Sequence, residues 1–539
     1  MLNQEINADI EYLTKEALRY KAGKLDEEEW RQIRLKNGVY GIRFQKDIQM
    51  LRVKVPFGEL NSEQLRVMAN IAEIFSTGIG HITTRQDIQF HWVALEAVPE
   101  ALRRLGEVGL STKEACGNTV RNVTACPLAG VCNKEEFDVT PYAKHMAYYL
   151  LRNPLTQKLP RKFKLAFSGC NDDCVKGMIN DIGAIAIVKN KNGKKTNGFR
   201  LYVGGGLGSP PRAAHLLEEF TTVQDLKATC ESIIRIFDRF GNRNNIFRAR
   251  MKFIIDQIGI RKFRKYVFTE RELLISKKMA DPITQIEDNN VLKRESISTK
   301  NISGDKEFKK WLKTNVEHQK QVGFYSVFVN LIGGDLTARQ FRILADIADN
   351  YSDGLIRTTI RQNVVFRWIN QKNLNNIFGE LNKSNLSVLG ANTICDVVGC
   401  PGADTCNLGV TRSHRLAMKL SEHLLEHEID IFSKEFEATN INISGCPNAC
   451  AQNHIATIGL FGSAQRVKGQ MTPFYQLQLG GAVTNGNVKF GEHSIRIPAK
   501  RVPEAISRLM SLYRSERQDN ETFKSWINRL RSDGGEEVG

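Results

Sequence analysis

The stretch TTRQDIQFHWV at residues 83–93 returns as TIRQNVVFRWI at residues 359–369, with an offset of 276 between matched positions. SGCNDDC at residues 168–174 returns at the same offset as SGCPNAC at residues 444–450. A register kept over such a distance indicates two copies of one large unit. The sequence therefore predicts a duplicated chain whose halves are related by pseudo-two-fold symmetry.

Each copy is expected to begin with short strands and one helix. In the first copy, GVYGIRF and QMLRVKVPFGEL are rich in strand-forming residues, and HITTRQDIQFHWV predicts the next pair of strands. Between them, the apolar spacing predicts a helix near Ser62–Phe75. This pattern is typical of a small α+β unit of βαβ type.

Composition limits the class of protein. A chain of 539 residues can hold about three domains, no apolar run is long enough to span a membrane, and the N-terminal segment lacks the apolar core of a secretory signal. Eleven cysteines suit a reducing compartment, which predicts a cytoplasmic protein. The net charge of +17 is spread along the chain without a nucleic-acid-binding motif, so we expect an acidic protein partner or an anionic substrate and no nucleic acid.

Eight of the cysteines fall into two sets of four with the same spacing, one set in each copy. In each set, five residues separate the first two cysteines and three residues separate the last two. The first quartet consists of Cys126, Cys132, Cys170 and Cys174. The second quartet consists of Cys400, Cys406, Cys446 and Cys450.

Thiolates offered in two close pairs suit a metal centre with soft sulfur ligands, either zinc or an iron–sulfur cluster. Zinc sites usually take their cysteines from tight turns with about two to four intervening residues, so the wider gap fits zinc poorly. A cubane cluster reaches further and is the interpretation that we prefer. The alternative is a set of structural thiols, since free cysteine is among the most buried residue types.

Four basic side chains of the first copy align with uncharged residues in the second. Converging arginines and lysines give charge-assisted hydrogen bonds to a small oxyanion and can supply protons. A surface salt bridge would explain any one of them, but the one-sided loss of all four favours a functional role. The four cations are Arg52, Arg121, Lys162 and Lys164, and their counterparts are Phe328, Cys395, Ala438 and Asn440.

The second quartet, with GCPNAC as its second half, resembles the cluster motif of the siroheme-containing sulfite and nitrite reductases. The resemblance runs from about Tyr40 to Leu512. It implies an α+β fold with two ferredoxin-like half-domains and two siroheme and iron–sulfur domains, arranged with pseudo-two-fold symmetry. In that family the second quartet would bind a [4Fe–4S] cluster, and Cys450 would also bridge to the siroheme iron.

The repeat and the resemblance together predict a chain of seven segments. A polar connector joins the two copies, and a short tail follows the second. In chain order we expect an N-terminal helical arm at 1–35, the first ferredoxin-like half-domain at 36–110, the first siroheme and iron–sulfur-type domain with the substrate cations at 111–276, the connector at 277–319, the second ferredoxin-like half-domain at 320–385, the second siroheme and iron–sulfur domain with the cluster cysteines at 386–515, and the C-terminal tail at 516–539.

The resemblance also implies which residues contact cofactor and substrate. The four cations match positions that line the open face of the siroheme in the family. Contacts with the siroheme carboxylates are implied for His81, Thr83, Arg85 and Gln89 in the first copy and for Gln362, Asn363 and Asn448 in the second.

By resemblance, the expected activity is the six-electron reduction of sulfite to sulfide. Plant-type nitrite reductases tend to carry asparagine where this chain has Lys164, and an additional cation suits the greater charge of sulfite. Reduction of nitrite to ammonia by the same centre is the nearest alternative. A non-catalytic iron–sulfur electron carrier and a zinc-stabilised nucleic-acid binder are alternatives from other classes.

No flavin- or nicotinamide-binding segment is recognisable in the sequence, so the electrons must come from a partner protein. The basic charge favours an acidic, ferredoxin-like donor. A separate flavoprotein subunit is the alternative.

One feature departs from the assimilatory members of the family. There, the first repeat has generally lost its cysteines, whereas here the first quartet is complete and predicts either a second [4Fe–4S] cluster or a relic of buried thiols. The missing cations of the second copy nevertheless predict one active site per chain. Cys116 resembles a position that some relatives cross-link to a tyrosine similar to Tyr40.

Overall fold

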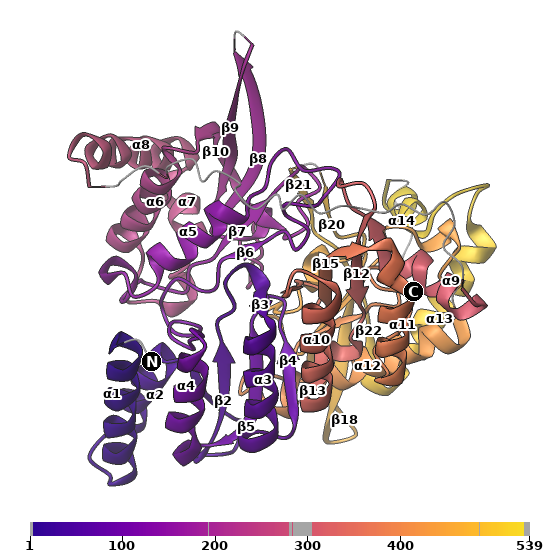
Figure 1. The fold of residues 1–539 in the computed structure, drawn as a ribbon, viewed down its shortest axis with the longest axis horizontal. Coiled ribbons are helices and arrows are strands. Elements are labelled where there is room, and N and C mark those ends of the chain that lie inside the picture. The colour runs from indigo at the N-terminus through magenta and orange to yellow at the C-terminus, as the bar shows by residue number, and fades with distance from the viewer. Residues whose placement is uncertain are drawn as a thin grey trace.

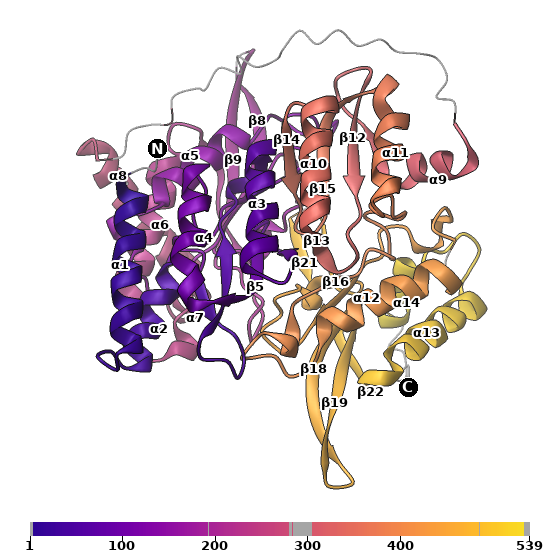
Figure 2. The same cartoon turned by 60° about the horizontal axis from the view of Figure 1, so that its bottom comes forward.

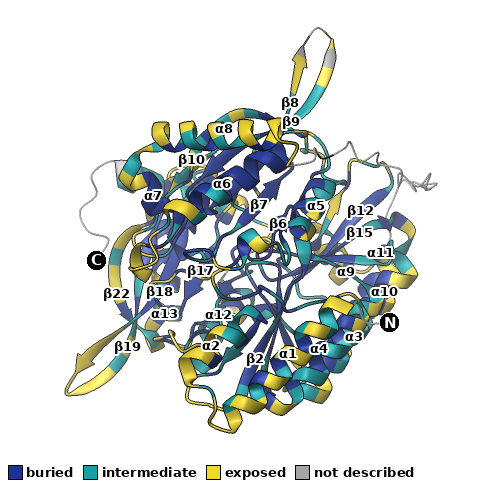
Figure 3. Cartoon of the chain, turned by 90° about the vertical axis from the view of Figure 1, so that its left-hand side faces the viewer, coloured by how far each residue is buried: buried dark blue, intermediate teal, exposed yellow. Residues whose placement is uncertain are grey.

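The computed structural model describes residues 4–191, 193–279, 283, 304–428, 430–484 and 486–532. These residues form a duplicated α+β structure with four five-stranded sheets, two in each copy (Figure 1). The strands are largely buried, and the helices present exposed outer faces (Figure 3). The predicted fold class is confirmed.

The first copy consists of a half-domain and a larger domain. The half-domain contains α1 Gln4–Lys21, α2 Glu27–Lys36, β1 Val39–Gly41, β2 Ile48–Val53, β3 Glu59–Asn61, α3 Ser62–Phe75, β4 Ile79–Ile82, β5 Ile88–Ala94 and α4 Val98–Glu107. The larger domain contains β6 Thr124–Ala125, α5 Thr140–Leu150, β7 Leu165–Ser168, β8 Ile182–Lys191, β9 Lys194–Val203, β10 His215–Thr222, α6 Leu226–Phe240, α7 Met251–Ile258 and α8 Ile260–Ser276.

The second copy repeats this plan. Its half-domain contains α9 Lys306–Asn315, β11 Val316–His318, β12 Phe324–Val329, β13 Asp335–Thr337, α10 Ala338–Tyr351, β14 Leu355–Thr358, β15 Val364–Asn370 and α11 Leu374–Lys383. Its larger domain contains β16 Val398–Gly399, α12 Ser413–His423, β17 Ile441–Ser444, β18 Ile458–Val467, β19 Gln470–Leu479, β20 Ala482–Thr484, β21 Asn487–Lys489, β22 Glu492–Pro498, α13 Val502–Glu516 and α14 Phe523–Ser532.

Each half-domain sheet is completed by a strand from the other copy. Strand β3 of the first copy pairs with β14, and β13 of the second copy pairs with β4, both antiparallel. The predicted helix Ser62–Phe75 forms as α3 and packs beside α10, and the two half-domains share one hydrophobic core (Figures 1 and 2). Because the exchange is reciprocal, neither copy can form its sheet without the other.

In the larger domains, two parallel strands carry the cysteines. Strand β6 pairs with β7 in the first copy, and β16 pairs with β17 in the second. Each quartet takes its first cysteine directly after the shorter strand and its third two residues after the longer one. Parallel neighbours end at the same edge of a sheet, so the duplication brings four thiols together in each copy.

Two long hairpins leave the body at opposite ends of the molecule. Strands β8 and β9 form one hairpin, and strands β18 and β19 form the other (Figure 2). They occupy equivalent positions in the two copies, which makes the pseudo-two-fold arrangement visible.

The structure places helices in the segments that we assigned to the connector and to the C-terminal tail. Helix α9 and strand β11 lie within the expected connector, and Trp311 of α9 is fully buried, as Trp30 is in α2. Helix α14 lies within the expected tail and buries Phe523 and Trp526. Sparse apolar residues in highly charged segments hid both helices in the sequence. Residues 284–303 and 533–539 lie outside the described residues.

Among the described residues, none of the helices is long and apolar enough to cross a membrane.

We expect the strand exchange to control stability. Arg357 in β14 is 1 % exposed and bonds Glu59 in β3, with Nε–Oε2 at 3.0 Å. Arg357→Ala should lower the free energy of unfolding by about 3–5 kcal/mol, because it leaves the Glu59 carboxylate without its main partner in a largely buried site. Urea unfolding followed by circular dichroism measures this loss.

The matched control is Arg66→Ala. Arg66 also joins the copies, bonding Asp346 and Asp349 at 2.7 and 2.8 Å, but its side chain is 43 % exposed. An exposed pair contributes about 1 kcal/mol or less. Equal losses in the two variants would contradict a special role for the exchanged strands.

Candidate functional site

The loop of the second quartet lies next to the first half-domain, where Asn407 Nδ2 donates to the Gly41 carbonyl at 3.0 Å. The Gly445 amide donates to Cys400 Sγ at 3.2 Å, and Asn448 Nδ2 donates to Cys446 Sγ at 3.5 Å. Cys450 interacts electrostatically with each of the other three cysteines. Such donors stabilise sulfur that carries negative charge, as a metal-bound thiolate does.

The thiol spacing argues against zinc. A tetrahedral zinc ion with Zn–S bonds of about 2.3 Å holds its sulfurs roughly 3.8 Å apart. Among the described residues, no three cysteine sulfurs lie within 4.8 Å of one another. The wider arrangement suits a cluster with several metal ions. Burial raises the pKa of Cys400 to about 12, so this thiolate needs a bound cation to persist at neutral pH.

Beside Cys450 lies a cavity that is open to solvent. Both copies supply its walls. The loop that carries Cys450 is fixed by Thr84 Oγ1, which donates to the Cys450 carbonyl at 2.8 Å. Five of the residues expected at the site line this cavity together: Arg85, Lys162, Lys164, Asn448 and Cys450.

The cavity concentrates buried positive charge. Burial lowers the pKa of Lys162 to about 8, and burial together with the nearby Arg85 and Lys162 lowers the pKa of Lys164 well below its usual value. Arg85 Nε and Arg250 Nε are buried and have no hydrogen-bond partner within the described part of the chain. Unpaired buried donors of this kind are suited to bind anionic oxygens.

The other two of the four cations, Arg52 and Arg121, meet at a tyrosine. Tyr40 OH accepts from Arg52 Nη1 at 3.1 Å and from Arg121 Nη1 at 3.4 Å. Neither arginine lines the cavity, although the positive charge of Arg121 contributes to lowering the pKa of Lys162 after burial, the main cause.

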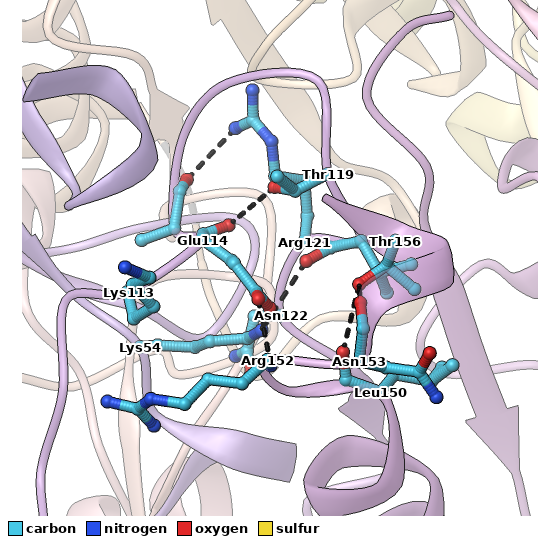
Figure 4. A network of polar contacts seen from close by, with 12 residues as sticks. Lys54, Lys113, Glu114, Thr119, Arg121, Asn122, Leu150, Arg152, Asn153 and Thr156 are labelled. Atoms are coloured by element: carbon cyan, nitrogen blue, oxygen red, sulfur yellow. Dashed lines mark hydrogen bonds and ion pairs between the residues drawn. The ribbon is translucent and has the colours of Figure 1, made fainter. Parts of the chain in front are cut away.

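The loop that carries Arg121 is held by a buried acid (Figure 4). Glu114 is fully buried, accepts from the Arg152 amide at 2.8 Å and lies 3.6 Å from Lys54 Nζ. Arg121 Nη1 donates to the Ala115 carbonyl at 3.0 Å. These contacts fix the direction of the guanidinium group.

Comparison with known proteins agrees with this geometry. The model of the nitrite and sulphite reductase 4Fe-4S domain matches residues 116–274 and 390–533, and that of the nitrite/sulfite reductase ferredoxin-like half domain matches residues 43–108 and 317–384. The chain belongs to the nitrite and sulphite reductase family. Each of the two models matches once in each copy, as the duplication predicts.

Curated relatives in the family act on different anions. The chain is 29 % identical over 495 residues to an assimilatory ferredoxin-dependent nitrite reductase of Haloferax mediterranei, covering 90 % of this chain and 82 % of that one. It is 29 % identical over 490 residues to a sulfite reductase [ferredoxin] of Mycobacterium tuberculosis, with the same coverage. The solved structure of the M. tuberculosis NirA protein superposes with a TM-score of 0.82 at 26 % identity, covering 98 % and 96 % of the two chains.

Other residues expected to contact the siroheme form hydrogen bonds with groups of the protein itself. His81 Nδ1 lies 2.8 Å from Asp335 Oδ1, and Asn363 Nδ2 donates to Asp396 Oδ2 at 2.8 Å. Thr83 Oγ1 accepts from the Arg85 amide at 3.1 Å. With Gln89 and Gln362, these side chains are not among the described residues that line the cavity.

Gln89 and Gln362 connect these internal networks. With its amide oriented to satisfy both neighbours, Gln89 accepts from Arg52 Nε at 2.8 Å. Gln362 Oε1 accepts from the Gly399 amide at 3.0 Å, next to Cys400. Gln89 therefore helps to position Arg52, and Gln362 helps to position the backbone next to Cys400, although neither glutamine lines the cavity.

The cross-link that some relatives form at the positions of Tyr40 and Cys116 is not tested by the structure. Cys116 is fully buried, and Arg121 Nη2 donates to the carbonyl of the next residue, Gly117, at 2.9 Å. Because Arg121 also reaches Tyr40, it joins the two parts of the chain that the cross-link would connect.

Three further basic residues line the cavity and were missed in the sequence: Arg161, Arg250 and Lys252. Arg250 Nη2 pairs with Asp181 Oδ2 at 2.8 Å, which also accepts from the Lys164 amide at 2.9 Å. Arg161 precedes Lys162 in the sequence, so its place at the cavity could have been predicted from that of Lys162. Arg250 immediately precedes α7 and Lys252 lies in its first turn, and only the fold brings them to the cavity.

We expect the second quartet to hold inorganic sulfide. Cys446→Ser should remove about four acid-labile sulfides per chain, because a serine oxygen is a poor substitute for a cluster thiolate. Sulfide and iron assays on protein purified without oxygen measure the loss. Cys395→Ser, which changes a buried cysteine outside both quartets, is the control. Equal sulfide content in the wild type and Cys446→Ser would contradict this assignment.

Proposed function

We propose that this protein is a siroheme- and [4Fe–4S]-dependent reductase that converts sulfite to sulfide. The observation that carries the proposal is the cavity in which basic residues of the first copy face Cys450 of the second. One copy supplies charge to an anion and the other supplies a thiolate to a redox centre. A simple electron carrier would have no use for such a cavity.

The residues suit both cofactors. The second quartet offers four thiols at a spacing too wide for zinc, which fits a [4Fe–4S] cluster. The unpaired Arg85 Nε and Arg250 Nε, with Lys252 nearby, fit the carboxylates of a siroheme. When bound, the siroheme and the cluster together supply the one-electron redox chemistry at the anion.

The chain's own residues bind the anion and supply protons. Lys162 and Lys164 form charge-assisted hydrogen bonds to its oxygens, and they release protons readily because burial lowers the pKa of both. Arg52 and Arg121 add a fixed positive field from the side of Tyr40. Oxygen leaves as water after protonation, so proton donors at the anion are required.

We propose a ferredoxin-like protein as the electron donor. Two of the relatives are named as ferredoxin-dependent or ferredoxin enzymes, and the net charge of +17 favours association with an acidic partner. Such an association should weaken as ionic strength rises.

Nitrite is the second candidate substrate, because the relative from Haloferax mediterranei is named as a nitrite reductase. Lys164 favours sulfite, since an additional buried cation stabilises the more highly charged anion. Steady-state assays with reduced methyl viologen and each anion test the proposal directly. A larger kcat/KM for sulfite supports it, and turnover of neither anion by protein loaded with siroheme refutes it.

Lys164 should control the preference between the two anions. Lys164→Asn introduces the residue of the second copy, Asn440, and should lower the ratio of kcat/KM for sulfite to that for nitrite about tenfold, because a charged hydrogen bond is lost. Lys468→Asn, at an exposed position between β18 and β19, is the matched control. An unchanged ratio would exclude Lys164 from anion selection.

The pH profile should report Lys162. Below about pH 8 this lysine is charged, so kcat/KM should decline as the pH rises through that value. Lys162→Arg keeps its charge at every accessible pH and should move the decline to higher pH while lowering kcat, since arginine is a poor proton donor. Protonation of the substrate affects the wild type and Lys162→Arg equally, so the difference between their pH profiles reports the residue at position 162. If kcat/KM declined at the same pH in both proteins, the decline would belong to a group other than Lys162.

A further inference from the structure

The first quartet is built on the same scaffold as the second. Cys126 follows β6 and is 4 % exposed, and Cys170 follows β7 and is 7 % exposed. Cys132 is half-buried, and Cys174 is exposed. The four thiols therefore lie at the edge of the second sheet of the first copy, with two inside and two near the surface.

The loops around the first quartet keep the backbone geometry of the second. Asp173 has φ +47° and its counterpart Ala449 has φ +53°, while Lys176 and Gln452 have φ +55° and +64°. Residues other than glycine rarely adopt this conformation. Its retention at matched positions shows that the loop shape before and after Cys174 was preserved.

The sulfurs also keep their amide donors. The amide two residues after Cys132 donates to its Sγ at 3.4 Å, and the amide two residues after Cys170 donates to that sulfur. Cys406 and Cys446 accept the corresponding bonds in the second copy. A thiol that served only as an apolar side chain would not require these donors.

The four thiols of the first quartet are neighbours. Cys170 interacts with both Cys132 and Cys174, and Cys174 interacts with Cys126. Among the described residues, no three cysteine sulfurs come within 4.8 Å of one another, a separation wider than a tetrahedral zinc site of about 3.8 Å. Neighbouring thiols are in contact in pairs, but no three of the sulfurs form the compact group that a tetrahedral zinc ion requires.

We propose that the first quartet binds a second [4Fe–4S] cluster, which has no substrate site of its own.

The place of a second anion site is filled with apolar side chains. Phe328 stands at the position of Arg52 and Val365 at that of Gln89, and both are buried together with Ala391. Leu128, from the loop between Cys126 and Cys132, packs against this group. An anion could not bind there without leaving its charge unpaired.

The counterpart of Arg85 is also neutralised. Arg361 Nε donates to Asp396 Oδ2 at 2.7 Å, whereas Arg85 Nε has no partner within the described residues. Asp396 occupies the position of the neutral Asn122 in the first copy. In the second copy the arginine is paired with an acid of the same copy, whereas in the first copy the Nε of Arg85 is left for a ligand.

The loop of the first quartet can hold its shape without metal. Asp173 is fully buried, and its Oδ1 accepts from Ser168 Oγ and from the Gly177 amide, both at 2.7 Å. Substitution of the two outer cysteines, Cys132 and Cys174, should therefore leave the fold intact, which makes them the better positions for a test.

The test is the acid-labile sulfide content of the full chain purified without oxygen. We expect about eight sulfides and about nine irons per chain with one siroheme, and about four sulfides fewer in Cys132→Ser/Cys174→Ser. Siroheme extracted from the double variant should be unchanged. Cys230→Ser, at a buried cysteine in α6, is the control and should keep every sulfide.

The Cys446→Ser background separates this inference from the proposed function. There the first quartet should still hold about four sulfides even when siroheme and activity are lost. Electron paramagnetic resonance of the reduced wild type should show two cluster signals, of which the outer double substitution removes one. About four sulfides in the wild type with no loss in the double variant, or zinc in place of iron, would overturn the proposal.

Discussion

The reciprocal exchange of a three-residue strand between the copies is the constraint on which the rest of the structure depends. Strand β13 lies against β4, and β3 lies against β14, so the two half-domains share one core. The exchange places the end of β4, with His81, against Asp335 of the other copy. The cavity lies outside this junction, but both copies supply residues that line it, so it cannot exist in one copy alone.

The clustering of like charges around the cavity destabilises the fold unless an anionic ligand is bound. The cavity walls bring lysines and arginines together, and Asp181, bonded to Arg250, is one of the few acids nearby. Burial lowers the pKa of Lys162 and Lys164 because the charged forms lose hydration without gaining a partner. An anionic ligand supplies the missing charge, so binding and stability are linked.

Divergence of the two copies followed a simple physical rule. Where the first copy keeps unpaired polar groups for a ligand, the second either packs apolar side chains, as at Phe328 and Val365, or adds a counter-charge, as at Asp396. The cysteine loops did not follow this rule. Their backbone geometry and sulfur donors remain the same in both copies, although the surroundings changed.

Local signals in the sequence were sufficient for the duplication, the helix Ser62–Phe75 and both quartets, because the spacing of cysteines and apolar residues is readable along the chain. The one-sided loss of cations drew attention to Lys162 and Lys164, and the structure places both in one cavity with Cys450. The tertiary structure alone decided the strand exchange, the burial of Trp311, and the arrival of Arg250 at the cavity. These depend on contacts between distant segments, and no local pattern encodes them.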